Sequence, residues 1–429
     1  MTIFEIFFLT FIVLMILRVP LYLCLIISSL VYFNLHPRLS MLTALQRMMH
    51  APNSFTLLAI PFFVFMGQVM SYGGVSRRIF RFADVLVGHW KGGLAYANII
   101  ASLIFAGKSG SALADIGALG PIQVKVMREA GYDDGTILGI SGASATVAPI
   151  TPPSIPLVIF GAMANVSIGG LFMAGIVPGL LIVIVLCIFV FFVSRFRNYP
   201  TRTRASLREI VGAFLDAFWA LLFPVIIVGG IWSGLFTPTE AALVAAVYGL
   251  FIAIIVYKDF TPKEIPRLVK ETIQLVGPAL AAVVGASLFA WILTFERIDR
   301  VIIDAIFNIS TNKFVVLLLI NLILLFLGMF LEIIAAVMIM LPILLPIIET
   351  IGVHPIHLGI IMVLNLMIGL MTPPIGFSLF MLSAISGVSF GKTLKYCLPW
   401  TVPLFIVLML VTYIEPLALF LPRLLGMVN

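Results

Sequence analysis

The sequence predicts an all-α polytopic membrane protein built from two inverted-topology repeats, each with a re-entrant hairpin and a broken helix. Three observations predict this class. The 429-residue chain is 62% hydrophobic and 10% charged, whereas soluble domains carry roughly 25% charged residues. Apolar runs at 171–194, 273–294 and 398–421 reach the roughly 20 residues that a helix needs to span a bilayer. Finally, the motif Thr-Pro-Pro occurs twice in apolar surroundings.

The two copies of this motif indicate an internal repeat. They begin at Thr151 and Thr372, one in each half of the chain. The same offset in numbering pairs further glycines and prolines, namely Gly107 with Gly328, Pro121 with Pro342 and Gly131 with Gly352. Because glycine and proline fix the shape of the backbone, their recurrence predicts two segments of similar structure.

The loop charges predict that the two copies lie upside down relative to each other. The segment after the first hairpin carries Lys125 and Arg128, whereas the matching segment of the second copy has no Lys or Arg. The loop 165–170 has none either, whereas its counterpart carries Lys392 and Lys395. Since Lys and Arg concentrate in cytoplasmic loops, this opposite bias indicates opposite orientation in the membrane.

Two repeats therefore divide the chain, and a basic cytoplasmic loop at 194–209 joins them. A second basic segment, 263–272, is expected to form an amphipathic helix on the membrane surface. The expected boundaries are 1–200 for the first repeat, with hairpin 94–122 and broken helix 137–160, and 201–429 for the second, with hairpin 314–348 and broken helix 358–381.

Inverted repeats with interrupted helices at matching positions are typical of secondary transporters. A broken helix frees backbone carbonyl and N–H groups that lipid cannot satisfy. The breaks must therefore be buried in protein or line a wet cavity. Two breaks brought together at the middle of the membrane offer carbonyl dipoles and helix ends, which suit a small cation and an anion.

Two cation sites are predicted, one in each repeat. In the first, a Ser-Gly hairpin tip offers hydroxyls and a close backbone approach to the first proline-rich break. The second is its inverted twin. The candidate residues are Ser109, Gly110, Ser111, Pro149, Thr151 and Pro152 for the first site, and Gly328, Glu332, Gly369, Thr372 and Pro373 for the second. Glu332 either stabilises a cation or contacts a helix N-terminus.

Four polar residues are predicted to bind substrate between the hairpin tips. Lys108 and Asp115 are charges inside an apolar segment, which are expensive in lipid. They either pair with each other or contact substrate or ion, or the lysine extends to a water-filled vestibule. Ser144 and Asn365 lie at matching positions, each at the same distance before the threonine of its Thr-Pro-Pro motif.

Enzymatic chemistry is not expected. The five histidines lie at predicted loops or helix ends, where none is placed to act as a base for the serines near the breaks. The spacing of His, Cys and acidic residues predicts no cofactor and no metal site beyond those of the small cation. The net charge of +7 follows from Lys and Arg in cytoplasmic loops, so no nucleic-acid partner is predicted.

Several segments resemble the large membrane subunit of TRAP (tripartite ATP-independent periplasmic) transporters. They include "SFTLLAIPFFVFMGQVM" (54–70), "GGIWSGLFTPTEAALVAAVYGL" (229–250), "TPPSIPLVIFGAMANVSIGGLFMAGIVPG" (151–179) and "LGMFLEIIAAVMIMLPILLPI" (327–347). The resemblance covers essentially the whole chain.

The resemblance implies an elevator-type architecture of the ion-transporter superfamily in the inner membrane of a prokaryote. It also implies symport of an organic acid into the cell with a cation, usually sodium. The implied partners are an extracytoplasmic solute-binding protein, a small four-helix membrane subunit on a separate polypeptide, and membrane lipid. A binding-protein-independent carboxylate transporter or a channel remains the alternative.

Overall fold

The computed structural model describes residues 2–17, 19–50, 52–72, 74–197, 199 and 201–428, and describes only the backbone of 107–109 and 299. Within these ranges the chain is helical and contains no strand. Seven of the described helices are long and apolar enough to cross a membrane, and the bent pair Arg300–Ile309 and Lys313–Gly328 adds an eighth span if it is counted as one. The predicted all-α polytopic class is therefore confirmed.

The helices follow one another with short connections. The first half contains α1 (Ile3–Ile16), α2 (Leu21–Leu35), α3 (Met41–His50), η1 (Phe55–Leu58), α4 (Ala59–Tyr72), α5 (Val75–Val87), α6 (Gly93–Ser109), α7 (Ala112–Glu129), α8 (Asp134–Ala145), α9 (Ile155–Ala164) and α10 (Ile168–Phe196). The second contains α11 (Leu207–Trp232), α12 (Pro238–Phe251), η2 (Ile252–Val256), η3 (Pro262–Glu264), α13 (Ile265–Phe295), α14 (Ile298–Ile309), α15 (Lys313–Gly328), α16 (Ile333–Thr350), α17 (Pro355–Gly369), α18 (Phe377–Ser386), α19 (Phe390–Tyr413) and α20 (Pro416–Leu424).

The order of helices recurs at the spacing of the Thr-Pro-Pro motifs. The starts of α7 and α16 are separated by the same offset as Thr151 and Thr372, and so are the starts of α8 and α17. The starts of α10 and α19 differ from that offset by a single position. Five consecutive helices, α6–α10, thus have counterparts in α15–α19.

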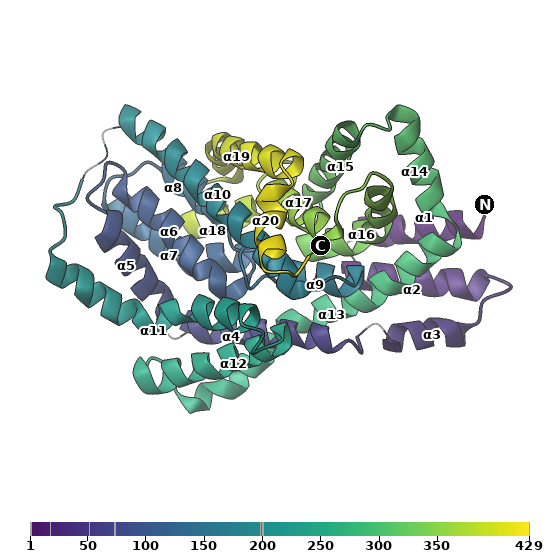
Figure 1. The fold of residues 1–429 in the computed structure, drawn as a ribbon, viewed down its shortest axis with the longest axis horizontal. Helices are drawn as coiled ribbons and strands as arrows, with labels where there is room; N and C mark the ends of the chain where they lie inside the picture. Colours follow the sequence, from purple (N-terminus) through teal and green to yellow (C-terminus); the bar gives the residue numbers. More distant parts are fainter. Residues whose placement is uncertain are drawn as a thin grey trace.

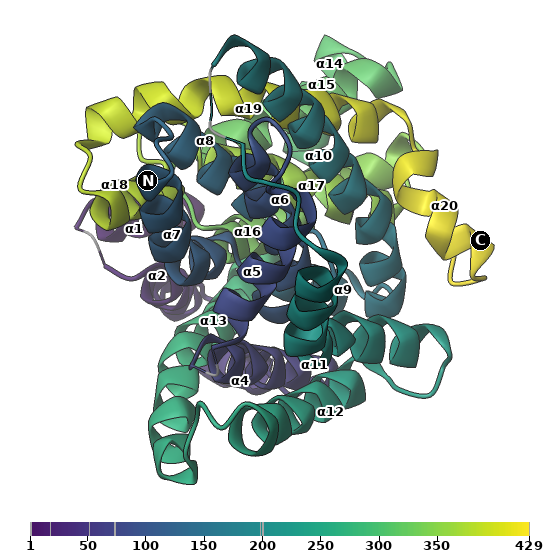
Figure 2. The ribbon, with the colours of Figure 1, turned by 90° about the vertical axis from the view of Figure 1, so that its left-hand side faces the viewer.

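The two halves interlock rather than lying side by side. Helix α2 packs along α13 and α4 packs along α12, so each of these contacts joins a helix of one half to a helix of the other. We call these four the cross-packed helices. Both views show α4, α12 and α13 together on the lower side of the molecule, beneath the hairpin helices (Figures 1 and 2).

The hairpins also cross between the halves. Helix α7 packs against α18, and α16 packs against α9. As a result, the second arm of each hairpin lies against the second part of the other half's broken helix. One continuous apolar core includes residues of both halves.

Helix starts follow local sequence signals. Thr237 caps α12 and the Glu240 carboxylate accepts a hydrogen bond from the Thr237 N–H, which together form a capping box. The segment 263–272, which is expected to form an amphipathic surface helix, is helical but is continuous with the span that follows it. Its residues form η3 and the first turns of the 31-residue helix α13, because the apolar periodicity continues without a break into the following segment.

Candidate functional site

The first hairpin consists of α6 and α7, and its tip falls at Gly110 and Ser111, as the sequence predicts. Gly110 has a φ of +55°, a conformation that glycine adopts readily. Ser111 is the N-cap of α7, and its hydroxyl accepts a hydrogen bond from the Ala114 N–H at 3.5 Å. The side chains of Lys108 and Ser109 lie outside the described residues, although the backbone places both in the last turn of α6.

The first broken helix consists of α8, a non-helical turn at 146–154, and α9. Ser154 caps α9, because its hydroxyl accepts from the Leu157 N–H at 3.2 Å and donates to the Pro149 carbonyl. The peptide bond between Pro152 and Pro153 is cis. Thr151 is not the cap. Its hydroxyl oxygen is buried without a hydrogen-bond partner in the described part of the chain.

The tip of the first hairpin lies directly on this break. A Cβ atom added to Gly110 would come within 2.6 Å of the Pro153 carbonyl oxygen and 2.8 Å of the Ile155 nitrogen. Real Cβ atoms do not approach that closely, so only glycine fits there. The structure therefore brings the predicted tip and the predicted break of the first site together.

The second hairpin consists of α15 and α16, and its tip covers 329–332. Glu332 is the N-cap of α16, where its carboxylate accepts a hydrogen bond from the Ile334 N–H at 3.0 Å. The helix N-terminal contact that the sequence offered as one interpretation of Glu332 is thus present. It occupies one carboxylate oxygen, Oε2.

The second hairpin likewise touches its own broken helix, which consists of α17, a turn at 370–376, and α18. A Cβ atom added to Gly369, the last residue of α17, would lie 2.6 Å from the Cα and carbonyl carbon of Gly328. The hydroxyl of Thr372 donates to the Ile368 carbonyl at 2.7 Å. The bond between Pro373 and Pro374 is cis, as at the first break.

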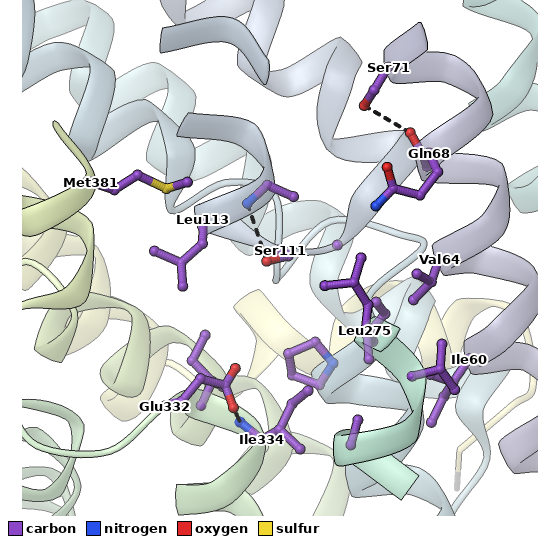
Figure 3. Close-up of a pocket in the computed structure, with 18 residues that line it drawn as sticks. Ile60, Val64, Gln68, Ser71, Ser111, Leu113, Leu275, Glu332, Ile334 and Met381 are labelled. Atoms are coloured by element: carbon purple, nitrogen blue, oxygen red, sulfur yellow. Dashed lines mark hydrogen bonds between the residues drawn. The ribbon is translucent and has the colours of Figure 1, made fainter. Parts of the chain in front are cut away.

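A cavity of about 430 Å³ lies between the two hairpin tips (Figure 3). Of the predicted residues, Gly110, Ser111 and Glu332 line it. The hairpins, α9 and α18 contribute seven further lining residues, namely Leu113, Ala114, Ile155, Pro156, Ile333, Ile334 and Met381. The remaining wall comes from the cross-packed helices α4 and α13, with Ile60, Val64, Gly67, Gln68, Ser71, Leu275, Val276 and Ala279.

The sequence did not indicate this second wall. Gln68 and Ser71 are its polar members, and both belong to α4, which reads as an ordinary apolar span. A glutamine inside that span was the only available signal. Among the described residues that line the cavity, none is Lys or Arg.

Three of the four predicted substrate residues have described side chains, and these lie inside helix packing rather than on the cavity. Asp115, Ser144 and Asn365 are each at most 1% exposed. Ser144 donates to Asn98 on α6 at 2.9 Å, and Asn365 donates to Asn321 on α15 at 2.7 Å. Both matching positions therefore link a broken helix to the first arm of its hairpin. The breaks behind the tips contain the remaining predicted ion-site residues, namely Pro149, Thr151, Pro152, Gly369, Thr372 and Pro373.

Paired hairpins and broken helices around a central cavity, in a multi-pass helical chain, define the membrane subunit of a secondary transporter. Residues 8–417 match the family described as "Tripartite ATP-independent periplasmic transporter, DctM component". The chain belongs to this family, as the sequence predicted. The family consists of transport subunits and not of enzymes, and the chain is a multi-pass protein of the prokaryotic inner membrane.

Named relatives share most of the length of the chain. The sialic acid TRAP transporter large permease protein SiaM of Vibrio cholerae is 44% identical over 381 residues, which are 89% of each chain. The C4-dicarboxylate TRAP transporter large permease protein DctM of Pseudomonas aeruginosa is 42% identical over 87% of each chain. The sialic acid TRAP transporter permease protein SiaT of Haemophilus influenzae is 38% identical over 97% of this chain and 68% of its own.

Two solved structures share the fold at low sequence identity. The YdaH transporter of Alcanivorax borkumensis superposes with a TM-score of 0.63 at 15% identity, over 88% of each chain. MtrF of Neisseria gonorrhoeae, which represents a class of antimetabolite efflux pumps, gives a TM-score of 0.62 at 11% identity, over 92% of this chain and 94% of its own. These likenesses concern the fold alone.

Proposed function

We propose that this chain is the transport subunit of a binding-protein-dependent symporter that carries an organic acid into the cell together with sodium ions. The observation that carries the proposal is the convergence of two hairpin tips on one cavity, with each tip lying against the break of its own broken helix. Such a place joins free backbone carbonyls, hydroxyls and helix ends, which are the groups that bind a small cation and an anion.

Coupling follows from the charges around the cavity. Glu332 faces it, and no Lys or Arg is among its described lining residues. An anion that enters the cavity is therefore repelled by this carboxylate, and no cationic side chain among the described lining residues compensates for the repulsion. A sodium ion bound at each hairpin tip supplies the missing positive charge, so the acid binds well only after sodium. Lys108, at the end of α6, is the further candidate for contact with the acid.

The substrate class is supported by the relatives. Those that carry a substrate in their names are called sialic acid, C4-dicarboxylate, 2,3-diketo-L-gulonate and isethionate transporters. All four are organic acids that are anionic at neutral pH. We assign an organic acid to this chain as a class, without choosing among them.

Two partners complete the transporter. One is an extracytoplasmic solute-binding protein, in keeping with the tripartite family. The other is a small membrane subunit on a separate chain. The lengths of two relatives support this second partner. This chain covers only 68% of SiaT and 58% of DctMQ, and each of these longer proteins is named simply a permease protein, without the word large.

Transport itself proceeds by an elevator movement of two inverted repeats, with boundaries at 1–200 and 201–429. The cross-packed helices form the static part, since they join the halves by long apolar contacts. The hairpins and broken helices move as a body past α4 and α13, and carry the cavity across the membrane. The opposite loop charges of the two copies support the inversion.

Reconstitution tests the proposal. The large and small subunits are placed in liposomes with the binding protein and its radiolabelled acid. Uptake is expected only with an inward sodium gradient and with the binding protein present. Uptake at the same rate with and without a sodium gradient would contradict the proposed coupling to sodium. Uptake of equal rate without the binding protein would favour the alternative, a binding-protein-independent carboxylate transporter, and downhill flux alone would favour a channel.

A further inference from the structure

A chain of buried polar side chains runs through the first hairpin. It involves two residues of α6, two of α7 and two of α8, all at most 2% exposed, namely Asn98, Ser102, Asp115, Gln123, Ser141 and Ser144. Polar groups buried in this way are expensive unless they are hydrogen-bonded. Such a concentration within one hairpin and its neighbour requires an explanation beyond packing.

The hydrogen bonds form one connected path. Gln123 on α7 donates to Asn98 Oδ1 at 2.8 Å, and Asn98 donates to Ser141 Oγ at 3.0 Å. Ser144 donates to Asn98 at 2.9 Å, and its Oγ lies 3.1 Å from the Ser102 Oγ, which has one proton to share between Ser144 and the Asp115 carboxylate. Ser102 donates to Asp115 Oδ2 at 3.0 Å. The path therefore ties α6 to α7 at two levels and ties α6 to α8, so its α7 members reach α8 only through α6.

Both Asp115 and Ser144 on this path lie close in sequence to the groups of the first predicted cation site. The Asp115 N–H donates to the Ser111 carbonyl at 3.0 Å, so the backbone of Asp115 is bonded to the residue that lines the cavity at the tip. Ser144 stands next to Ala145, where α8 ends and the proline-rich turn begins. A shift of Asp115 relative to Ser144 is thus a shift of the tip relative to the break.

The second hairpin is built differently. Asn365 donates to Asn321 on the first arm, and Asn321 donates onward to Thr412 on α19 at 3.2 Å. Among the described residues, no side-chain hydrogen bond joins α15 to α16. The two arms of the second hairpin are therefore held by apolar packing, whereas those of the first are held by a carboxylate and an amide.

We infer that Asp115, acting through Ser102, is a positioning residue that holds the tip of the first hairpin against its break and so sets the sodium affinity of the first site. The inference deepens the proposed function and rests on it for the sodium part. Asp115 is not in contact with the ion. It fixes Ser111 and Gly110, and the matching position of the second half needs no equivalent because that hairpin is anchored elsewhere.

Hydrogen–deuterium exchange tests the positioning independently of transport. Ser102→Ala removes the donor to Asp115, Asp115→Leu removes the acceptor, and Asp115→Asn keeps an acceptor oxygen. Ser28→Ala is the matched control, because the Ser28 hydroxyl is also fully buried but bonds only within its own helix α2. We expect faster exchange at 107–113 in Ser102→Ala and Asp115→Leu, a smaller increase in Asp115→Asn, and none in Ser28→Ala.

Sodium titration of uptake gives the second readout. Ser102→Ala is expected to raise the half-saturating sodium concentration about tenfold, which is the effect of losing one hydrogen bond to a charged group, with little change in maximal rate. Unchanged exchange at 107–113, an equal increase at 329–332, or an unchanged sodium requirement would each overturn the inference. If wild-type uptake needs no sodium, the proposed function fails, while the exchange data still decide whether Asp115 positions the tip.

Discussion

Gly328 and Gly369 show what single residues contribute to this site. They come from two separate elements, and each occupies the space in which a side chain of the other would lie. Their contact brings the last turn of α15 onto the last turn of α17, so that the two helix ends meet in one region. A Cβ atom on Gly369 would lie 2.6 Å from the Gly328 backbone, so position 369 requires glycine, whereas a Cβ atom on Gly328 would make tight contacts at 3.2 Å.

Gly369→Ala is predicted to separate the second hairpin from its break. Overpacking of this kind costs about 1–3 kcal/mol, so the thermal midpoint in detergent should fall and uptake should be lost. Gly212→Ala is the control, because a Cβ there meets nothing within 4 Å in helix α11. Alanine should be neutral or slightly stabilising at that position. A Gly369→Ala variant with normal uptake would contradict the close-contact account.

Thr372→Val is predicted to raise the sodium concentration needed for half-maximal uptake. The Thr372 hydroxyl gives its proton to the Ile368 carbonyl, which leaves the lone pairs of its oxygen available to a cation. Valine keeps the shape and removes that oxygen, whereas Thr372→Ser keeps it. Sodium titration of uptake checks this. Equal sodium requirements in the valine and serine variants would show that Thr372 only caps the helix end.

The broken helices are the elements that contain the proposed ion sites, and each is stabilised by its own local bonds. At the first break, Ser154 bonds to both sides of the turn, because it caps α9 and holds the Pro149 carbonyl. The second break has Gly376, with a φ of +59°, before α18 instead of a serine. The two breaks therefore share their position in the sequence but not their hydrogen bonds.

Ser154→Ala is predicted to destabilise the first break. Loss of an N-cap hydrogen bond costs about 0.5–2 kcal/mol, and here the partner groups are buried as well. Thermal unfolding should show a lower midpoint than in the wild type, and Ser154→Thr should recover part of it. An unchanged midpoint for the alanine variant would show that the turn is held by packing alone.

The sequence was sufficient to predict where these elements break, since the hairpin tips and proline-rich turns fall where glycine, serine and proline interrupt the apolar runs. It was not sufficient to predict which helices meet. Gln68, Leu275 and the Asn98–Gln123 bond became visible only in the structure, because no periodicity indicates that α4 and α13 face the hairpins. Ser144 and Asn365 were found by the repeat, but their bonding to the hairpin arms was not.

At the scale of the whole molecule, the linker loop 194–209 that joins the two halves is bonded to the first half. The phenol of Tyr199 donates to Asp133 at 2.6 Å and stacks on Tyr132 at 4.2 Å, while Arg197 pairs with the same aspartate. Burial raises the pKa of Asp133, but hydrogen bonds from Arg197 and Tyr199 outweigh this and lower that pKa to about 2.

The contacts of Asp133 with this linker predict that the thermal stability of the protein falls at low pH. Because the folded pKa of Asp133 is below its ordinary value of 3.8, the stabilisation is present above about pH 4 and is lost as the pH falls towards about 2. When the pH is lowered from about 5 to about 3, the thermal midpoint in detergent should therefore fall less in Asp133→Asn than in the wild type. Identical slopes would show that this linker contact does not stabilise the fold.

The central claim is that each hairpin tip and its break form one sodium site beside the shared cavity. The most direct test is equilibrium binding of radioactive sodium to the purified permease. The account predicts two saturable ions per chain in the wild type and one in Gly369→Ala, with the first site retained. Binding of a single ion in both proteins, or of none, would contradict it.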